Sequence, residues 1–323
     1  MAKTLWVLTD NRRGSVSQAM GIVDFIDKSQ LTVIEKKLDY TRLSALPNWL
    51  RGKSLLGITD ESKKRIIPPY PDYVLSISRR TVPIARYIKK HSPNTKLIQL
   101  MHPGKSGLHE FSLVVVPEHD KNKVNSANIH YIVGCPHRVT NTYLQEAKQY
   151  WQAKFSHLPH PLTAVIIGGA IKKKPFSEEN ALALGKAIYN LKKQIGGSIL
   201  ITTSRRTGQT AQDIIMQEIK DIPQYTYLWG DKTENPYSGF LACADNIVVT
   251  ADSVSMCCEA TGTGKPIYLF TGKDWLTPKH LRFVQSLLTN QCAVLLNENI
   301  DINFKPQKSL NAAAEVASLI EKL

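Results

Sequence analysis

The second half of the chain contains two short runs of residues suited to holding a diphosphate. Gly168 and Gly169 follow an apolar run that predicts a buried strand, and glycines let a backbone approach a ligand closely. The next apolar run leads into residues 202–207, where hydroxyl side chains flank two arginines. Arginine matches the geometry of phosphate oxygens. The expected anion contacts are Gly168, Gly169, Thr203, Ser204, Arg205 and Arg206.

A third run extends this site and adds a group for a ribose. A strand is predicted to end at Thr250, and residues 252–255 then begin a helix whose free N–H groups attract an anion. Glu259 lies a turn or so inside this helix, where a carboxylate can hold both ribose hydroxyls. The alternatives are simple capping by Asp252 and Ser253, and a surface helix acid for Glu259. The expected contacts here are Asn235, Tyr237, Asp252, Ser253, Ser255, Met256 and Glu259.

Candidate acid–base groups lie in the first half. Asp10 ends the first predicted strand and is the expected general base, unless it belongs to an ordinary strand-to-helix turn capped by Ser15. His102 and His119 also follow strands; they are substitutes for Asp10, or else loop residues. The polar loop after the first strand can cradle an anion where a helix begins. Its candidate acceptor-binding residues are Arg12, Arg13, Ser17 and Gln18.

Residues 46–58 mix apolar and basic side chains. Trp49, Arg51 and Lys53 stand among leucines, and a Lys-Lys-Arg run follows at 63–65. Tryptophan and leucine beside arginine and lysine suit a segment that lies on an anionic membrane. The alternative is a helix packed on the first sheet.

Several sharper motifs are absent. Residues 259–266 superficially resemble a P-loop, but Glu259 stands at the first glycine position and Pro266 where a hydroxyl residue should bind magnesium. Neither half opens with a G-x-G-x-x-G turn, no Asp-x-Asp pair occurs, and the cysteines lack zinc spacing. We expect no metal and no cofactor; a nucleoside-diphosphate sugar is expected as a substrate.

The charge of the chain is uneven. The 323 residues carry 41 Lys and Arg against 27 Asp and Glu, a net charge of +14. Residues 1–145 hold 22 basic and 11 acidic side chains, and the remainder 19 and 16. A basic half favours an anionic partner, unless the surface is merely basic. The partners expected are a nucleotide sugar and an anionic lipid or membrane surface, and not nucleic acid, because no recognition motif is present.

Composition narrows the class further. Hydrophobic residues make up 42% and charged residues 21%, as in a globular protein with a substantial core. No apolar run approaches the ~18 residues that span a bilayer. The N-terminal apolar stretch is too short for a signal peptide, and five scattered cysteines do not form a disulfide framework. These features predict a cytoplasmic protein, with peripheral placement at the inner face of the membrane as an extension.

Short apolar runs alternate with helical patterns, which is typical of parallel sheets wrapped by helices. The predicted strands lie at 5–8, 31–34, 73–77, 96–100, 113–116, 129–133, 164–167, 198–201, 225–228, 247–249, 267–270 and 293–296. A helix is predicted over 15–28, and another begins at Ser177 with Ala181, Leu184, Ile188 and Leu191 as its apolar stripe. We expect two Rossmann-like α/β domains, 1–145 and 160–310, with a linker at 157–161 and a closing helix at 311–323.

The chain resembles the bacterial relatives of the plant "elongated mitochondria" fission factor. The resemblance rests on residues 9–21, 134–140 and 202–207, and most of all on the block from Asn235-Pro236-Tyr237 to Gly264-Lys265-Pro266. That family is similar to glycosyltransferases with two facing Rossmann-like domains, the GT-B arrangement. The resemblance implies a donor nucleotide-sugar site in the second half and an acceptor site in the first. The plant member acts as a membrane-associated adaptor.

These inferences converge on a metal-independent GT-B-like glycosyltransferase that uses a nucleoside-diphosphate sugar and an anionic or lipid-linked acceptor. Two alternatives stay open. One is a sugar-nucleotide epimerase of the same architecture. The other is a non-catalytic membrane-associated adaptor.

Overall fold

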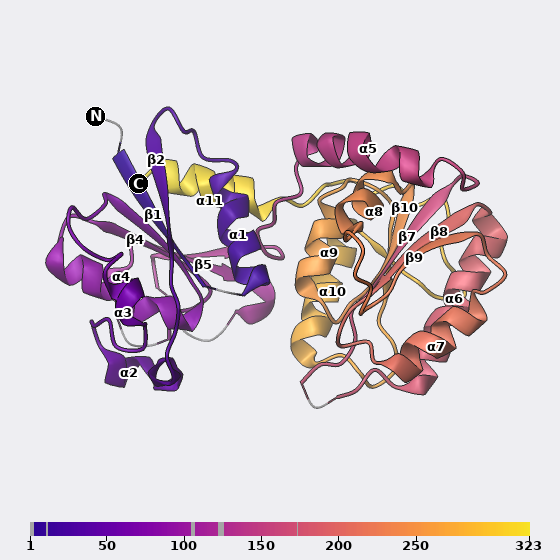
Figure 1. The fold of residues 1–323 in the computed structure, drawn as a ribbon, viewed down its shortest axis with the longest axis horizontal. Coiled ribbons are helices and arrows are strands. Elements are labelled where there is room, and N and C mark those ends of the chain that lie inside the picture. Colours follow the sequence, from indigo (N-terminus) through magenta and orange to yellow (C-terminus); the bar gives the residue numbers. More distant parts are fainter. Residues whose placement is uncertain (1–2, 11, 105–106, 122–125, 173) are drawn as a thin grey trace. The chain divides into compact units, whose positions relative to one another are not determined.

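The computed structural model describes residues 3–10, 12–104, 107–121, 126–172 and 174–323, which divide into two units. The first unit combines residues 1–138 with 311–323, and the second spans 139–310. Each unit contains one six-stranded sheet in which every paired strand is parallel (Figure 1). The two Rossmann-like α/β units predicted from the alternating pattern are therefore confirmed.

The first sheet has the strand order β2-β1-β3-β4-β5-β6. Strands β3 and β5 are buried along their whole length, which explains why they stand out in the sequence as mainly apolar runs. The bounds are β1 (Lys3–Thr9), β2 (Leu31–Lys37), β3 (Tyr73–Ile77), β4 (Lys96–Leu100), β5 (Leu113–Pro117) and β6 (Ile129–Ile132).

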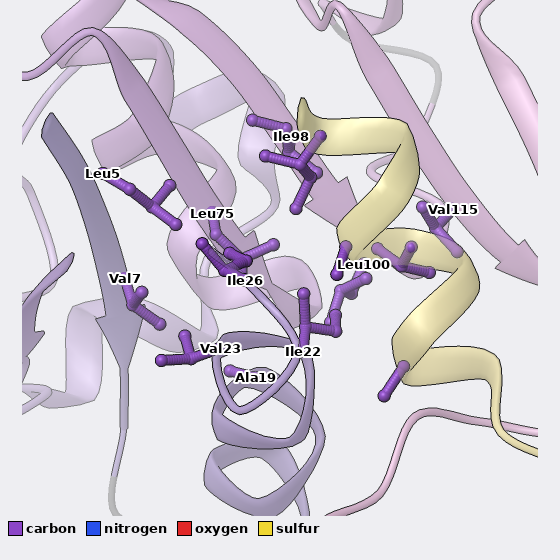
Figure 2. Close-up of a cluster of buried hydrophobic side chains, with 14 of the residues drawn as sticks. Leu5, Val7, Ala19, Ile22, Val23, Ile26, Leu75, Ile98, Leu100 and Val115 are labelled. Carbon is purple, nitrogen blue, oxygen red and sulfur yellow. The ribbon is translucent and has the colours of Figure 1, made fainter. Parts of the chain in front are cut away.

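Two helices from opposite ends of the chain cover one face of this sheet. They are α1 (Arg13–Val23) and α11 (Ala312–Glu321). Figure 2 shows Val23 of α1 beside Val7 of the sheet and Ile22 beside Leu100, with α11 in yellow next to Leu100. The predicted closing helix is thus part of the first unit. The predicted helix 15–28 ends early, at Val23, where the amides of Phe25 and Ile26 bond three residues back instead of four. A turn follows in which the Asp27 carboxylate accepts hydrogen bonds from the backbone and hydroxyl of Ser29.

The other face of the first sheet is covered mainly by α4 (Ser78–His91), with residues 58–66 packed beside it. Two four-residue helices, α2 (Asn48–Arg51) and α3 (Asp60–Lys63), lie in the connection between β2 and β3. Short 3-10 helices occur at Arg42–Ala45, Leu108–Glu110 and Glu118–Asp120.

The second sheet has the strand order β12-β11-β10-β7-β8-β9. Helices α6 and α7 cover one face, and α9 and α10 the other (Figure 1). The strands are β7 (Leu162–Ile167), β8 (Ser198–Thr203), β9 (Gln224–Tyr227), β10 (Asn246–Thr250), β11 (Ile267–Phe270) and β12 (Val294–Leu295). The helices are α5 (Asn141–Phe155), α6 (Glu178–Ile195), α7 (Gln209–Glu218), α8 (Tyr237–Cys243), α9 (Val254–Thr261) and α10 (Pro278–Thr289).

Helix α6 begins and packs as its sequence predicts. The Ser177 hydroxyl accepts a hydrogen bond from the Asn180 backbone at 3.2 Å, which confirms the predicted N-cap. The predicted apolar stripe is fully buried; it consists of Ala181, Leu184, Ile188 and Leu191.

The boundary between the units lies earlier than predicted. Residues 139–155 belong to the second unit, because Trp151 and Phe155 of α5 are buried there and the Phe155 ring lies 5.7 Å from that of Phe240. The expected linker at 157–161 connects α5 to β7 inside the second unit. Its Pro161 carbonyl accepts a hydrogen bond from the Ser198 backbone at the start of β8. The chain crosses between the units twice, between residues 138 and 139 and between residues 310 and 311.

Each sheet has one point at which its strand order reverses. In the first sheet β1 lies between β2 and β3, and in the second β7 lies between β8 and β10. Open parallel sheets bind ligands beyond the carboxyl ends of the strands at such a point. The loops after β1 and β3, and those after β7, β8 and β10, are therefore the places where this fold positions functional groups.

Candidate functional site

Three loops of the second unit are joined by hydrogen bonds at its switch point. The Gly168 amide donates to the Thr250 hydroxyl at 2.7 Å, which ties the end of β7 to the end of β10. The Gly169 amide donates to Asp252 Oδ2 at 2.9 Å. The Ala170 amide donates to the carbonyl of Arg206, after β8, at 2.8 Å. The segments predicted to contact an anion are thus held together at one edge of the sheet.

An ion pair lies at the centre of these loops. Arg206 Nη1 is 2.9 Å from Asp252 Oδ2 and also donates to the Ala170 carbonyl at 3.1 Å. The Asp252 side chain is fully buried, whereas 38% of the Arg206 side chain is exposed. Burial raises the pKa of Asp252, while Arg206 and the Thr250 hydroxyl act in the opposite direction. Asp252 therefore holds the arginine, and the exposed part of the guanidinium stays accessible to a ligand.

Close packing against neighbouring loops requires glycine at positions 168 and 169. A Cβ atom at Gly168 would lie 2.2 Å from a carboxylate oxygen of Asp252. Gly169 has φ +149°, and a Cβ atom there would lie 2.0 Å from the Arg206 carbonyl oxygen. Both residues let the neighbouring loops approach closely, and direct ligand contact by these glycines stays a prediction.

The hydroxyl residues before the arginines mostly serve the loop itself. Thr203 is buried; its hydroxyl donates to Gln212 at 2.6 Å and accepts the Trp229 amide at 2.8 Å. The Ser204 hydroxyl donates to the Gly168 carbonyl at 2.6 Å. Arg205 is exposed. Thr203 and Ser204 therefore have supporting positions, and the arginines supply the accessible charge.

Helix α9 begins with an uncapped N-terminus beside this ion pair. Ser253 occupies the N-cap position, but no side chain accepts a hydrogen bond from the first turn. The first bond runs from the Cys257 amide to the Ser253 carbonyl at 3.0 Å. In the part of the chain that the structure describes, the amides of residues 254–256 donate no hydrogen bond. The alternative of simple capping is thus wrong. Val254, Ser255 and Met256 are partly exposed at a positive helix end.

Glu259 lies further along α9 and is not a solvated surface acid. It is partly buried, and its carboxylate accepts a hydrogen bond from the Tyr237 hydroxyl at 2.5 Å. Burial raises the pKa of Glu259, and the bond from Tyr237 lowers it in part. Burial together with the nearby carboxylate raises the pKa of Tyr237 well above its ordinary value. Asn235 fixes the start of α8, because its side chain accepts the Tyr237 amide at 3.0 Å.

In the first unit, Asp10 lies at the end of β1 and is 2% exposed. Its Oδ1 accepts the Arg12 amide at 3.0 Å, and its Oδ2 lies 3.8 Å from Arg12 Nε. Ser15 does not cap α1, so the turn differs from the alternative considered above. Ser17 is partly buried and Gln18 buried. The side chain of Arg13 lies outside the described residues.

The two candidate histidines lie at the same edge of the first sheet as Asp10. His102 follows β4, accepts the Gly104 amide at Nδ1 at 3.0 Å, and has a pKa lowered by burial. His119 follows β5, is 4% exposed, and has Nε2 4.0 Å from Asp120. Both follow strands that lie beyond β3 in the sheet, so the strand order places β3 between Asp10 and His102.

In the segment expected to lie on a membrane, residues 46–58, some of the named side chains are exposed and one is buried. Trp49 is 71% exposed and Leu50 is also exposed. Arg51, in contrast, is 1% exposed, and its guanidinium donates to the carbonyls of Leu56 at 3.0 Å and Arg80 at 3.2 Å. Arg51 is therefore not a membrane contact, because it holds the loop against α4. Lys53 pairs with Glu110 at 3.2 Å.

Three residues at the first switch point are missing from the expected set: Tyr40, Ser78 and Arg80. A signal for two of them exists in the sequence, because Ser78-Arg79-Arg80-Thr81 repeats the Ser204-Arg205-Arg206-Thr207 motif after another strand. Tyr40 gives no local signal. Across the described ranges, no three His, Cys, Asp or Glu side chains gather in a way that could hold a metal ion. No described helix is both long enough and apolar enough to cross a bilayer.

Solved structures with the same architecture belong to the GT-B fold. A crystal structure of MurG from Acinetobacter baumannii superposes with a TM-score of 0.54 at 12% identity, over 99% of this chain and 100% of the other. The UDP-GlcNAc 2-epimerase of Methanocaldococcus jannaschii, in complex with UDP-GlcNAc and UDP, gives 0.55 at 13% identity with the same coverage. At these identities the likeness establishes the fold alone, and this chain has a GT-B-like fold.

Sequence relatives are more informative about ancestry. An uncharacterized protein of Rickettsia prowazekii, RP120, is 31% identical, and the match covers 98% of this chain and 97% of the relative. The mitochondrial fission protein ELM1 of Arabidopsis thaliana is 30% identical; the match covers 72% of this chain but only 58% of the plant protein. The family model described as "Mitochondrial fission ELM1" matches residues 13–323. With nearly its whole length matched, the chain belongs to the mitochondrial fission ELM1 family.

Proposed function

We propose that the second unit binds a nucleoside-diphosphate sugar and that the protein is a metal-independent glycosyltransferase. One observation carries the proposal: at the switch point of one sheet an uncapped helix start lies beside an arginine held by a buried carboxylate, and a partly buried glutamate lies further along that helix. These are a dipole and a cation for a diphosphate, and an acceptor pair for two vicinal hydroxyls.

The roles follow from the contacts. The exposed part of Arg206, the exposed Arg205, and the amides of residues 254–256 hold the diphosphate. Glu259 accepts the ribose hydroxyls after exchanging its bond with Tyr237. Gly168, Gly169 and Asp252 keep the loops in register. Ser253, Ser255 and Met256 line the helix start.

The transfer step needs charge stabilisation and one base. An acceptor hydroxyl attacks the anomeric carbon of the sugar, and a new C–O bond forms. The bond from that carbon to the diphosphate oxygen breaks, and the electron pair leaves with the nucleoside diphosphate. The arginines and helix amides stabilise the charge that develops there. Asp10 is the proposed base that takes the hydroxyl proton.

Binding of UDP and UDP-GlcNAc by calorimetry tests the donor site. We expect Glu259→Ala to weaken binding at least ~10-fold, because one hydrogen bond to a charged group contributes about 1.5–3 kcal/mol. Glu298→Ala, which removes an exposed acid elsewhere in the unit, is the matched control. Equal affinities for the wild type and Glu259→Ala would refute the ribose assignment.

An epimerase of the same architecture is the second candidate. It is favoured by the similarity of the fold to that of the Methanocaldococcus jannaschii UDP-GlcNAc 2-epimerase. Product analysis separates the two. An epimerase converts UDP-GlcNAc alone into an isomer, whereas a transferase releases UDP only when an acceptor is supplied. Absence of any nucleotide binding would favour the adaptor function instead.

A further inference from the structure

A second polar cluster lies at the switch point of the first sheet. In the register of β1 and β3, Leu8 is paired with Ser76, so Asp10 and Ser78 lie side by side just beyond the paired residues. Tyr40 follows β2 on the other side of β1, where the Leu38 amide bonds to the Thr9 carbonyl. Three neighbouring strands therefore deliver polar side chains to one place.

Buried polar atoms in this cluster lack hydrogen bonds among the residues that the structure describes. They are Asp10 Oδ2, the Tyr40 hydroxyl, Arg51 Nη1 and Ser78 Oγ. Asp10, Arg51 and Ser78 are 2%, 1% and 9% exposed. Leaving a buried polar group unsatisfied costs about 1–3 kcal/mol. Several such groups in one place indicate that a polar ligand completes them.

Short distances link Tyr40 and Arg51 of this cluster through Arg80. Arg51 Nη2 donates to the Arg80 carbonyl in the first turn of α4 at 3.2 Å. The Arg80 guanidinium lies 5.4 Å from the centre of the Tyr40 ring. Burial raises the pKa of Tyr40, the nearby Asp10 carboxylate raises it further, and the neighbouring arginines lower it in part.

Ser78 adds backbone strain at the same point. It is the first residue of the 14-residue helix α4 and has φ +70°, a conformation that costs a residue with a side chain about 1–3 kcal/mol. The strained residue sets its unpartnered hydroxyl at the positive end of the helix. A helix start, two arginines and two hydroxyl donors make this an environment for an anion.

We propose that this cluster binds the phosphate of a phosphate monoester that carries a neighbouring hydroxyl. The phosphate meets Ser78, Tyr40, Arg51, Arg80 and the start of α4. The hydroxyl donates to Asp10, because a carboxylate next to a lone phosphate would repel it. This inference rests on the proposed function in one respect only: the hydroxyl at Asp10 would be the group that receives the sugar.

Calorimetry with glycerol 3-phosphate tests the site. It is done in Arg206→Gln protein, which weakens the anion site of the second unit. Ser78→Gly removes the hydroxyl and suits the positive φ, and Tyr40→Phe removes a buried hydroxyl without a partner. We expect each to weaken binding at least ~10-fold while the melting temperature stays equal or rises. Tyr131→Phe, on β6 of the same sheet, is the control and should bind normally.

Two phosphate monoesters, one with and one without a neighbouring hydroxyl, test the role of Asp10. Methyl phosphate has no neighbouring hydroxyl, so Asp10→Asn should bind it more tightly and should lose the preference for glycerol 3-phosphate. Wild-type affinity in Ser78→Gly and Tyr40→Phe, or no binding of glycerol 3-phosphate at all, would overturn the proposal.

A second experiment distinguishes a phosphate on a lipid headgroup from a phosphate on a soluble ligand. Co-sedimentation with phosphatidylcholine vesicles containing phosphatidic acid, lost in Ser78→Gly, identifies a lipid headgroup. Binding of glycerol 3-phosphate without such co-sedimentation identifies a soluble ligand. UDP affinity is measured in parallel in protein that retains Arg206. A chain that binds glycerol 3-phosphate through Ser78 but binds no UDP keeps this site and loses the transferase proposal.

Discussion

At the level of single residues, the hydrogen bond between Tyr237 and Glu259 makes the proposed nucleotide site sensitive to pH. In that proposal the ribose hydroxyls donate to Glu259 as a carboxylate, so the acid must be ionised to accept both. Burial raises the pKa of Glu259, and the Tyr237 hydroxyl lowers it in part by stabilising the charged form. As the pH falls, Glu259 therefore becomes protonated at a higher pH than an ordinary glutamate does.

We expect UDP affinity to fall as the pH is lowered through this raised pKa. Tyr237→Phe removes the bond that stabilises the carboxylate, so the midpoint should move to higher pH. Calorimetric titration of UDP between about pH 5 and 8, in the wild type and Tyr237→Phe, measures both midpoints. An affinity that does not change with pH would contradict the assignment of Glu259.

At the scale of elements, the proposed donor site depends on the packing of three loops. The strand ends bring Gly168, Arg206 and Asp252 together, and two of the contacts leave no room for a methyl group. The site is thus assembled from backbone contacts between loops as much as from side chains.

Gly168→Ala should therefore disturb the site. The added Cβ would meet the Asp252 carboxylate at 2.2 Å, so this ion-pair partner must move. Overpacking of this kind costs about 1–3 kcal/mol. We expect a lower denaturation midpoint and loss of UDP binding. Gly14→Ala, in a helix position with nothing within 4 Å, should retain both and rule out a general effect of alanine.

The elements themselves are largely predictable from sequence. Runs such as 73–77, 96–100 and 267–270 coincide with strands because parallel strands buried on both faces are mainly apolar. The sequence also identifies which loops follow strands, and hence which segments meet. The sequence does not reveal that Arg51 is buried. Its guanidinium donates to the carbonyls of Leu56 and Arg80, and the fold alone brings these partners near it.

The candidate site divides in the same way. Residues with reactive or charged side chains that follow strands, such as Arg206 and Glu259, can be recognised individually in the sequence. The roles of Gly168 and Thr203 as loop supports are not, because they depend on partners 84 and 9 residues away in the sequence, Asp252 and Gln212. Ligand binding by these residues stays a prediction.

At the scale of the whole molecule, charge and exposed apolar surface favour contact with an anionic membrane. The net charge is +14, and residues 1–145 carry an excess of 11 basic side chains, from 22 against 11. Trp49 and Leu50 are exposed in that half, as are Leu43 and Ile67. Interfacial tryptophan and leucine with nearby cations are a common means of peripheral binding.

Trp49→Ala should therefore weaken flotation with anionic vesicles several-fold without changing thermal stability, because the side chain is 71% exposed. Trp229→Ala, which removes another exposed tryptophan in the second unit, is the control and should float as the wild type does. Equal flotation with neutral and anionic vesicles would remove the membrane from this account.

The first unit takes its last helix from the far end of the chain, since α11 covers the same sheet face as α1. During synthesis the ribosome therefore releases the whole second unit before the first can be finished. Until α11 emerges, the apolar face formed by residues such as Leu75, Ile98 and Val115 lacks half of its cover. The nascent chain must keep that face from aggregating while about half of the protein is still being made.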